Sequence, residues 1–197
     1  MTPGRPTPGG PSAPHGPHHR DQETTMPHDI TTPAGRPVAD TGPVGVDFAV
    51  RWYRSWIDGW NSHDPEQVRD IVTQDFWLDS PTTRHTGWDV RGQQCAVDYV
   101  RYVLGAYPDL VWEVTAPPMF ATEDARVSFS WRGTGHFSGT LTPPGIPGTG
   151  RPFAFAGLET FDFRDGRACY LNATYDLLGL MKQIGVYRSP TGRGAAS

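Results

Sequence analysis

The feature that most restricts the fold of this chain is a change of hydrophobic period at Pro108. Before Pro108, apolar residues recur about every four positions, as they do on one face of a helix. After it they recur every second position, as in half-buried strands. Helices followed by strands predict an α+β domain, in which a curved antiparallel sheet wraps around N-terminal helices and leaves an internal apolar cavity between them.

The helical half of the pattern begins at Val46. A first helix is predicted over 46–60, because its apolar residues share one face: Phe48, Trp52, Trp56 and Trp60 at a spacing of four, with Ala49, Val50 and Tyr53 beside them. Asp64, followed by Pro65, is a favourable N-cap for a short second helix over 66–72. A third helix is predicted over 91–106.

The strand half of the pattern contains four long segments. A short strand at 76–79, closed by a turn at Ser80-Pro81, comes before them. The long strands are predicted at 111–115, 126–132, 153–163 and 167–175, with Asp165-Gly166 as a hairpin turn between the last two. A final helical turn over 177–184 closes the domain.

Composition separates one domain from its tails. Residues 1–44 hold ten of the 20 prolines and no Phe, Trp or Tyr, so they cannot bury enough apolar surface to offset the cost of ordering. We therefore expect a disordered tail at 1–44, one domain at 45–190 and a disordered C-terminus at 191–197. Met26 is an alternative physiological start, and His15, His18 and His19 are read as part of a solvated low-complexity arm.

From charge, hydropathy and cysteine spacing we do not expect nucleic-acid binding, membrane contact or a metal site. The net charge of −4, from 21 acidic and 17 basic side chains, shows no basic cluster for nucleic acid. The chain has no apolar run of about 18 residues and no signal-peptide core, so we expect a cytoplasmic protein without membrane contact. Cys95 and Cys169 have no zinc-like or disulfide-framework spacing, and His63, His85 and His136 lack metal-binding spacing. No cofactor or metal is expected.

Five sequence segments, in this order, carry a resemblance to a known family: WIDGWNSHDPEQVRDIVTQDFWLDSP, YPDLVWEV, GTGHFSGTLTPPGIPGTGRPF, FDFRDGR and YDLLGLMKQIG. Together they resemble the SnoaL-like polyketide cyclases of the nuclear transport factor 2-like superfamily. The resemblance implies a cone-shaped α+β barrel, often dimeric, with an internal apolar cavity. In the cyclases it implies a cofactor-free intramolecular aldol ring closure, whereas other relatives are isomerases, epoxide hydrolases or hydroxylases, or only bind ligands.

Three residues are candidates for acid–base chemistry. Asp176 matches the position at which the cyclases carry an acid/base aspartate, and an apolar cavity wall would raise its pKa. Its alternative role is to cap the following helical turn. His136, in GTGH, is able to polarise a carbonyl group, although a structural role is equally open. Asp79 lies where ketosteroid isomerases place a proton-shuttling aspartate directly before proline. Here Ser80 intervenes, which turns Asp79 to the opposite face of a strand unless a bulge restores its direction.

Aromatic residues are the candidates for the cavity wall, with core packing as the alternative for each. The candidates for substrate binding are Tyr53, Trp56, Trp60, Trp77, Tyr102, Trp131, Phe153 and Phe155, of which Trp60 and Trp131 are preferred. Asn172, where family members often have tryptophan, is expected to donate a hydrogen bond to the substrate. Arg84 and His85 are expected to be solvent-exposed near the cavity mouth.

The leading functional hypothesis is a cofactor-free cyclase that acts on a small hydrophobic polyketide, as a homodimer without nucleic acid or membrane partners. One alternative is an isomerase, epoxide hydrolase or hydroxylase that acts on another hydrophobic natural product in the same pocket. A third hypothesis, of a different class, is a non-catalytic module that binds a small ligand.

Overall fold

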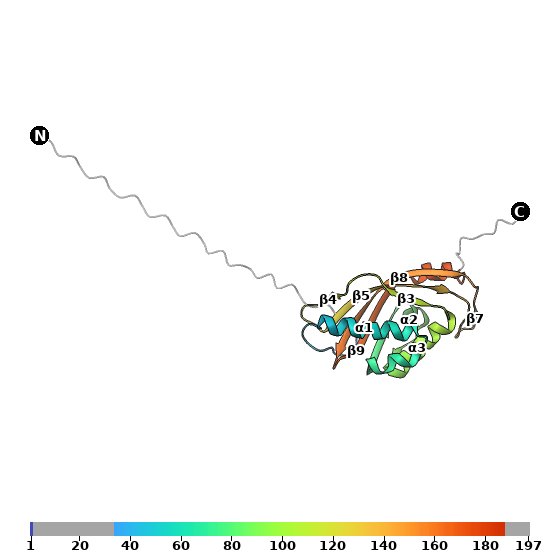
Figure 1. Cartoon of the computed structure of the whole chain (residues 1–197), viewed down its shortest axis with the longest axis horizontal. Helices are drawn as coiled ribbons and strands as arrows, with labels where there is room; N and C mark the ends of the chain where they lie inside the picture. The colour runs from blue at the N-terminus through green and yellow to red at the C-terminus, as the bar shows by residue number, and fades with distance from the viewer. Residues whose placement is uncertain (2–33, 188–197) are drawn as a thin grey trace. The chain divides into compact units, whose positions relative to one another are not determined.

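The structure is a computed structural model that describes Met1 and residues 34–187 (Figure 1). Within this part the chain forms four α-helices, one 3-10 helix and nine strands. The helices are α1 (Val46–Asn61), η1 (Pro65–Ile71), α2 (Pro81–Thr86), α3 (Gly92–Ala106) and α4 (Leu177–Gln183). The strands are β1 (Val72–Asp79), β2 (Val90–Arg91), β3 (Val111–Val114), β4 (Met119–Phe120), β5 (Arg126–His136), β6 (Thr140–Leu141), β7 (Ile146–Pro147), β8 (Pro152–Arg164) and β9 (Arg167–Tyr175).

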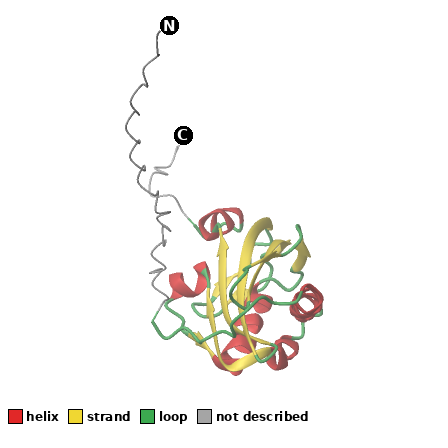
Figure 2. Cartoon of the chain, turned by 90° about the vertical axis from the view of Figure 1, so that its left-hand side faces the viewer, coloured by secondary structure: helices red, strands yellow, loops and turns green. Residues whose placement is uncertain are grey.

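Seven of these strands form one sheet, in the order β2-β1-β9-β8-β5-β3 with β4 also paired to β5. Strands β5 and β8 are the longest pair, and Figure 2 shows the long strands bending as they cross the domain. The remaining strands, β6 and β7, form a separate two-stranded hairpin. The predicted α+β class, with helices first and a curved sheet after them, is confirmed.

The sheet is mixed, which corrects the expectation of a purely antiparallel sheet. Strand β1 pairs with β9 in parallel, with Leu78 opposite Leu171 and Asp79 opposite Asn172. The expectation rested on strands that follow one another and are joined by hairpins, which makes them antiparallel. Since most of the domain separates β1 from β9 along the chain, no hairpin sets their relative direction.

The aromatic face of α1 packs on the inner face of the sheet, as the four-residue spacing predicts. Tyr53 stacks on Phe129 of β5 with ring centroids 3.8 Å apart, and Trp56 meets Phe161 of β8 at 5.4 Å. Trp52 is also buried in this layer. Val50, predicted on the same face, is 39% exposed, because at 3.6 residues per turn it lies roughly 80° beyond the arc that the four-residue series covers.

The turn predicted at Ser80-Pro81 is instead the start of α2. The Ser80 side chain accepts a hydrogen bond from the backbone N–H of Thr83 at 3.1 Å, and the Thr83 hydroxyl accepts one from the backbone N–H of Ser80 at 2.8 Å. This reciprocal capping box, with proline at the first helical position, initiates a helix. The cap predicted at Asp64 is confirmed, although the segment after it is a 3-10 helix.

Residues 34–44 belong to the folded domain, which corrects the predicted tail boundary at residue 44. The backbone N–H of Asp40 donates to the Phe163 carbonyl at 2.9 Å, and the Asp40 carbonyl accepts from the Ala125 N–H at 3.1 Å. These bonds extend the sheet region toward the N-terminus. The disorder predicted for residues 2–33 and 191–197 lies outside the described residues, and so do Met26, the His15–His19 cluster and residues 188–190, which were predicted to end the domain.

Gly157 of β8 makes room for a tryptophan on the neighbouring strand. It lies directly opposite Trp131 of β5. A Cβ atom at Gly157 would stand 2.5 Å from Cζ2 of the Trp131 indole and 2.5 Å from the Thr174 carbonyl oxygen. Both distances are shorter than van der Waals contact, so a side chain at this position would displace the indole or the backbone of β9.

We predict that Gly157→Ala lowers the free energy of unfolding by about 1–3 kcal/mol, because the added methyl group overpacks the Trp131 site. Urea denaturation would measure the change. The matched control is Gly105→Ala in α3, where an added Cβ meets nothing within 4 Å, so no loss of stability is expected. Equal effects of the two substitutions would contradict this account of Gly157.

Candidate ligand-binding and active site

A cavity of about 420 Å³ lies between the inner face of the sheet and the helices. Its wall is predominantly aromatic, and the aromatic lining residues come from α1, α3, the loop after α3, and four strands: Trp56, Trp60, Tyr99, Tyr102, Tyr107, Trp112, Trp131, Phe155 and Tyr175. The volume and the apolar wall suit a small hydrophobic molecule.

One end of the cavity is bounded by the β6–β7 hairpin and by α4. Leu141 and Ile146 from the hairpin and Leu177, Leu180 and Met181 from α4 contribute aliphatic side chains to the wall. His85 and Thr86 of α2 are exposed to solvent and also line the cavity, so they mark its mouth. The exposure expected for His85 is confirmed.

Glu159 is a buried carboxyl group on this otherwise apolar wall. It lies on β8, and its side chain is 6% exposed. The Tyr53 hydroxyl and the Trp56 indole N–H donate to its Oε2 atom at 3.0 and 3.2 Å. Burial raises the pKa of Glu159 to about 7, while these two hydrogen bonds act in the opposite direction. Both protein donors use Oε2, which leaves Oε1 without a hydrogen-bond partner among the described residues.

A carboxyl group with this pKa exchanges a proton near neutral pH, which is what general acid–base catalysis requires. Among the described lining residues, Glu159 is the only carboxyl group, and His85 at the mouth is the only imidazole. Glu159 therefore supplies the proton-transfer capacity in the interior of the cavity.

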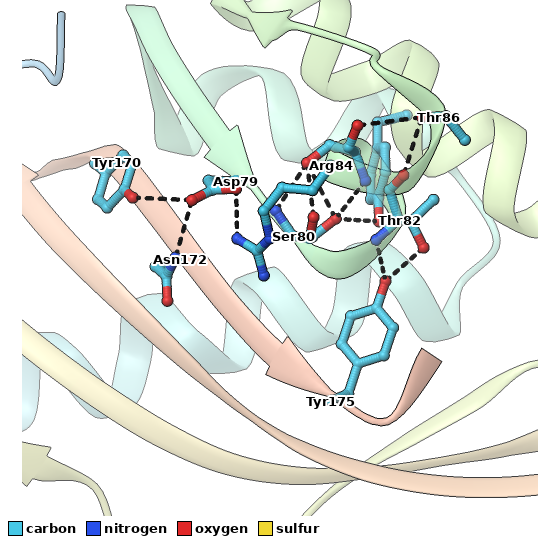
Figure 3. Close-up of polar contacts among 10 residues, drawn as sticks. Asp79, Ser80, Thr82, Arg84, Thr86, Tyr170, Asn172 and Tyr175 are labelled. Carbon is cyan, nitrogen blue, oxygen red and sulfur yellow. Dashed lines mark hydrogen bonds and ion pairs between the residues drawn. The ribbon is translucent and has the colours of Figure 1, made fainter. Parts of the chain in front are cut away.

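A second polar group of the cavity wall is made of hydroxyls (Figure 3). The Tyr175 hydroxyl of β9 lies 2.6 Å from Oγ1 of Thr82 in α2. The Tyr99 hydroxyl lies 3.2 Å from Oγ of Ser80, and burial raises the pKa of Tyr99 well above its ordinary value. A hydroxyl group both donates and accepts, so these four side chains are suited to form hydrogen bonds with a ligand.

Asp79 and Asn172 lie on the opposite face of the sheet from the cavity. Their neighbours Leu78 and Leu171 line the cavity, and successive residues of a strand face opposite sides. The Asn172 amide donates to Asp79 at 3.1 Å, and Arg84 forms an ion pair with Asp79 at 2.6 Å (Figure 3). The predicted contact of Asn172 with substrate is corrected, and the doubt about Asp79 as a proton shuttle is upheld, because β-strand alternation directs both side chains outward.

Asp176 caps α4 instead of lining the cavity. Its side chain is exposed, and one carboxylate oxygen accepts from the backbone N–H of Gly179 at 2.8 Å. The alternative role as a cap is the one that the structure shows. The expected position of Asp176 on an apolar wall is corrected, because the chain leaves the sheet at this residue to start a helix.

His136 also lies outside the cavity lining. It ends β5 with an exposed side chain, and its Nδ1 atom lies 2.6 Å from Oδ2 of Asp109. The backbone N–H of His136 donates to the same carboxylate at 2.7 Å and, together with the ring, lowers the pKa of Asp109. The pair ties the end of β5 to the turn before β3, and the role expected for His136 at a substrate carbonyl is corrected.

The aromatic candidates divide into two groups. Five of them line the cavity as expected, and their contact with a substrate stays a prediction: Trp56, Trp60, Tyr102, Trp131 and Phe155. Three others do not line it. Tyr53 is buried behind Glu159, Phe153 packs against Tyr107, and Trp77 lies on the outer face against Tyr170.

Glu159 was missed at the level of sequence, although a signal for it exists. The inward-facing positions of the strand over 153–163 are alternate residues, and Glu159 stands in the same phase as Phe155 and Phe161. A carboxylate in the phase of an apolar series is rare unless it has partners or a function. Here the partners come from α1, which the strand pattern alone does not reveal.

Residues 53–171 match the sequence model of the SnoaL-like domain. The chain belongs to the SnoaL-like family. No curated protein matches it. Its fold is nuclear transport factor 2-like and is shared with solved structures at low sequence identity.

A putative SnoaL-like polyketide cyclase from Jannaschia sp. CCS1 has a TM-score of 0.61 and 20% identity, covering 72% of this chain and 94% of that one. AclR, a putative hydroxylase from Streptomyces galilaeus, has a TM-score of 0.59 and 20% identity, covering 74% and 89%. IdmH, a putative polyketide cyclase from Streptomyces antibioticus, has a TM-score of 0.56 and 23% identity, covering 70% and 98%. At these identities the likeness shows the fold.

Two further observations concern the residues that the structure describes. Nowhere in this part do three or more His, Cys, Asp or Glu side chains gather as metal ligands. None of its helices combines the length and apolar character that crossing a bilayer requires.

The raised pKa of Glu159 predicts a pH-dependent stability. A carboxyl group with a folded-state pKa of about 7 keeps its proton in the folded state, while the unfolded state releases it above about pH 4.3. The contribution of Glu159 to the free energy of unfolding is therefore highest below about pH 4.3. It falls as the pH rises from there and levels off above about pH 7. Relative to Glu159→Gln, the wild type is expected to lose about 3 kcal/mol between about pH 4.5 and pH 8.

Urea denaturation of both proteins across this pH range checks the prediction. The comparison with Glu159→Gln cancels the titration of all other groups, provided that the variant is folded. A pH-independent difference in unfolding free energy between the two proteins would contradict the assignment of a raised pKa to Glu159.

Proposed function

We propose that this protein is a cofactor-independent cyclase, which closes a ring in a polyketide-type substrate by an intramolecular aldol reaction in its apolar cavity. The observation that carries the proposal is Glu159, a buried carboxyl group of raised pKa at the wall of an aromatic cavity. Membership of the SnoaL-like family and the fold shared with two proteins named as putative polyketide cyclases support the reaction class.

In this reaction Glu159 acts as the base and then as the acid. Its ionised form takes a proton from the carbon next to one carbonyl group of the substrate, and the electron pair of that C–H bond moves into an enolate. The enolate carbon attacks a second carbonyl carbon, which forms the new C–C bond and leaves an alkoxide. The alkoxide oxygen takes the proton back from Glu159, so the enzyme is unchanged at the end of the cycle.

The surroundings of Glu159 suit both halves of this cycle. Tyr53 and Trp56 hold Oε2, so the free Oε1 is the oxygen that exchanges the proton. A pKa of about 7 keeps the protonated and ionised forms comparably populated at neutral pH, and neither direction of transfer is strongly uphill. The aromatic wall orients a flexible chain for attack and excludes water from the enolate.

The test uses a 1,5-diketone that carries one naphthyl group, because its aldol closure and loss of water give an aryl cyclohexenone with a distinct absorption band. The wild type is expected to accelerate this closure. Glu159→Gln is expected to lower turnover at least about 100-fold, because the general base is lost. Equilibrium dialysis would show whether the variant still binds the diketone.

The matched control is Asp176→Asn, which keeps the cap on Gly179 and lies outside the cavity. Its turnover is expected to equal that of the wild type. A loss of turnover in Asp176→Asn with full activity in Glu159→Gln would overturn the assignment of the base. Binding of the diketone by the wild type without any ring closure would instead favour a ligand-binding module.

A further inference from the structure

Three tyrosines of the cavity wall carry hydroxyl groups that the proposed proton transfer does not use. Tyr102 lies on α3, Tyr107 directly follows α3, and Tyr175 ends β9; all three line the cavity. Tyr107 is 8% exposed, and the other two are half-buried. A tyrosine in an apolar wall has one polar atom at the tip of its ring, so the surroundings of the hydroxyl decide its role.

The hydroxyls of Tyr102 and Tyr107 form no hydrogen bond with any described residue. They differ from the indole nitrogens of Trp60, Trp112 and Trp131, which also lack a partner but have no accessible surface, because both hydroxyls keep accessible surface. Burial raises the pKa of Tyr107, so protein surrounds its hydroxyl on most sides. Accessible surface in such surroundings belongs to the cavity that Tyr107 lines, and this hydroxyl therefore faces the space of the ligand.

The Tyr175 hydroxyl and Thr82 together have one hydrogen to spare. The two hydroxyl oxygens are 2.6 Å apart, so one of their two hydrogens lies between them (Figure 3). The backbone N–H of Thr82 donates to the Tyr175 oxygen at 3.3 Å and supplies no acceptor. Whichever hydroxyl donates to the other, the second hydroxyl hydrogen has no acceptor among the described residues. The pair thus provides a third free donor.

Ring contacts place Tyr107 and Tyr175 at the same end of the cavity. The Tyr107 ring lies 4.9 Å from Phe153, the Tyr175 ring lies 5.5 Å from Phe155, and these two phenylalanines are 5.7 Å apart. Glu159 lies six residues beyond Phe153 on β8, which is roughly 20 Å along an extended strand. The tyrosine end and the carboxyl group are therefore well separated.

Electrostatics agree with a grouped and neutral set of hydroxyls. Burial raises the pKa of Tyr102, and the nearness of Tyr175 raises it further. The nearness of Tyr102 and Tyr175 likewise adds to the effect of burial on the pKa of Tyr107. Among the lining residues that the structure describes there is no lysine or arginine, so an anionic group of a ligand would find no opposite permanent charge.

We propose that Tyr102, Tyr107 and the Tyr175–Thr82 pair form a binding site for an uncharged carbonyl oxygen of the ligand, at the end of the cavity remote from Glu159. Free donors in an apolar wall lack an acceptor, and a ligand that supplies one gains the hydrogen bond. A carbonyl oxygen has two lone pairs and no hydrogen, so it accepts from two of these donors without adding a further one.

The site deepens the proposed function, on which its meaning for the reaction rests. It holds a carbonyl group that takes no part in ring closure, while Glu159 removes a proton at the other end of the same molecule. The substrate class is then an elongated, uncharged polyketide with an apolar middle and oxygen atoms at both ends. Anchoring one end fixes which carbon atom reaches Glu159.

The test compares 4-acetylbiphenyl with 4-isopropylbiphenyl, which have nearly the same shape and differ in one carbonyl oxygen. At about pH 8.5 Glu159 is ionised and repels that oxygen, so equilibrium dialysis is expected to show tighter binding of the ketone through the tyrosine end. Tyr102→Phe and Tyr107→Phe each keep the ring and remove a donor. Tyr107→Phe is expected to weaken ketone binding about threefold to tenfold and to leave the hydrocarbon unaffected.

The infrared carbonyl stretch of the bound ketone reports hydrogen bonding directly. It is expected at a lower frequency than in an aprotic solvent, and to rise in Tyr107→Phe and in Tyr102→Phe. Tyr175→Phe is expected to cause a smaller rise, because the Thr82 hydroxyl is then free to donate. The matched control is Tyr170→Phe, which removes a hydroxyl bonded to Asp79 outside the cavity lining and is expected to leave the stretch unchanged.

Equal affinity of the wild type for the two probes, including no binding of either, would overturn the proposal. A ketone preference and a carbonyl frequency that Tyr102→Phe and Tyr107→Phe both retain would also overturn it. Unchanged binding of 4-isopropylbiphenyl shows that a variant has kept its cavity. The assay involves no turnover, so a ketone preference that depends on Tyr107, together with inactivity of the wild type on the naphthyl diketone, would uphold the carbonyl site and reject the cyclase.

Discussion

The packing of the aromatic face of α1 against the inner face of the sheet is the contact on which the rest of the structure depends. The same face that buries Trp52 also delivers Tyr53 and Trp56 to the carboxyl group of Glu159. Burying a carboxyl group without partners would cost several kcal/mol, and two donors offset part of that cost. Stability and chemistry therefore share one helix face, so a change at Tyr53 or Trp56 would affect both.

Much of the fold was predictable because it follows from local periodicity. The spacing of Phe48, Trp52, Trp56 and Trp60 places α1, and the alternation after Pro108 places the long strands, with ends within a few residues of those observed. Family membership likewise follows from segments in order along the chain. What periodicity does not contain is the pairing of distant strands. The parallel β1–β9 pair is decided by the packing of the whole domain, and no local pattern specifies it.

The site was less predictable for the same reason. Asp176 was chosen from its motif context, yet a carboxylate one residue past the end of a strand is equally suited to start a helix, and that local role prevailed. Glu159 lies in the middle of a strand, in a position whose importance depends on two donors from a helix about 100 residues earlier. Motif resemblance is sufficient to predict the cavity. The groups with acid–base or hydrogen-bonding capacity on its wall depend on which side chains of separate elements meet there.

The place of β9 in the sheet has a consequence for how the protein forms during synthesis. Of the strands that the structure describes, β9 is the last to leave the ribosome, yet it lies between β1 and β8 in the sheet order. Until residues 167–175 emerge, β1 has only the two-residue strand β2 beside it, and the aromatic wall that β9 closes stays open to solvent. The nascent domain therefore carries an exposed apolar surface and two unpaired strand edges until β9 has been synthesised. Its vulnerability to aggregation is set by the final stretch of the domain, and chaperone protection would matter most in that interval.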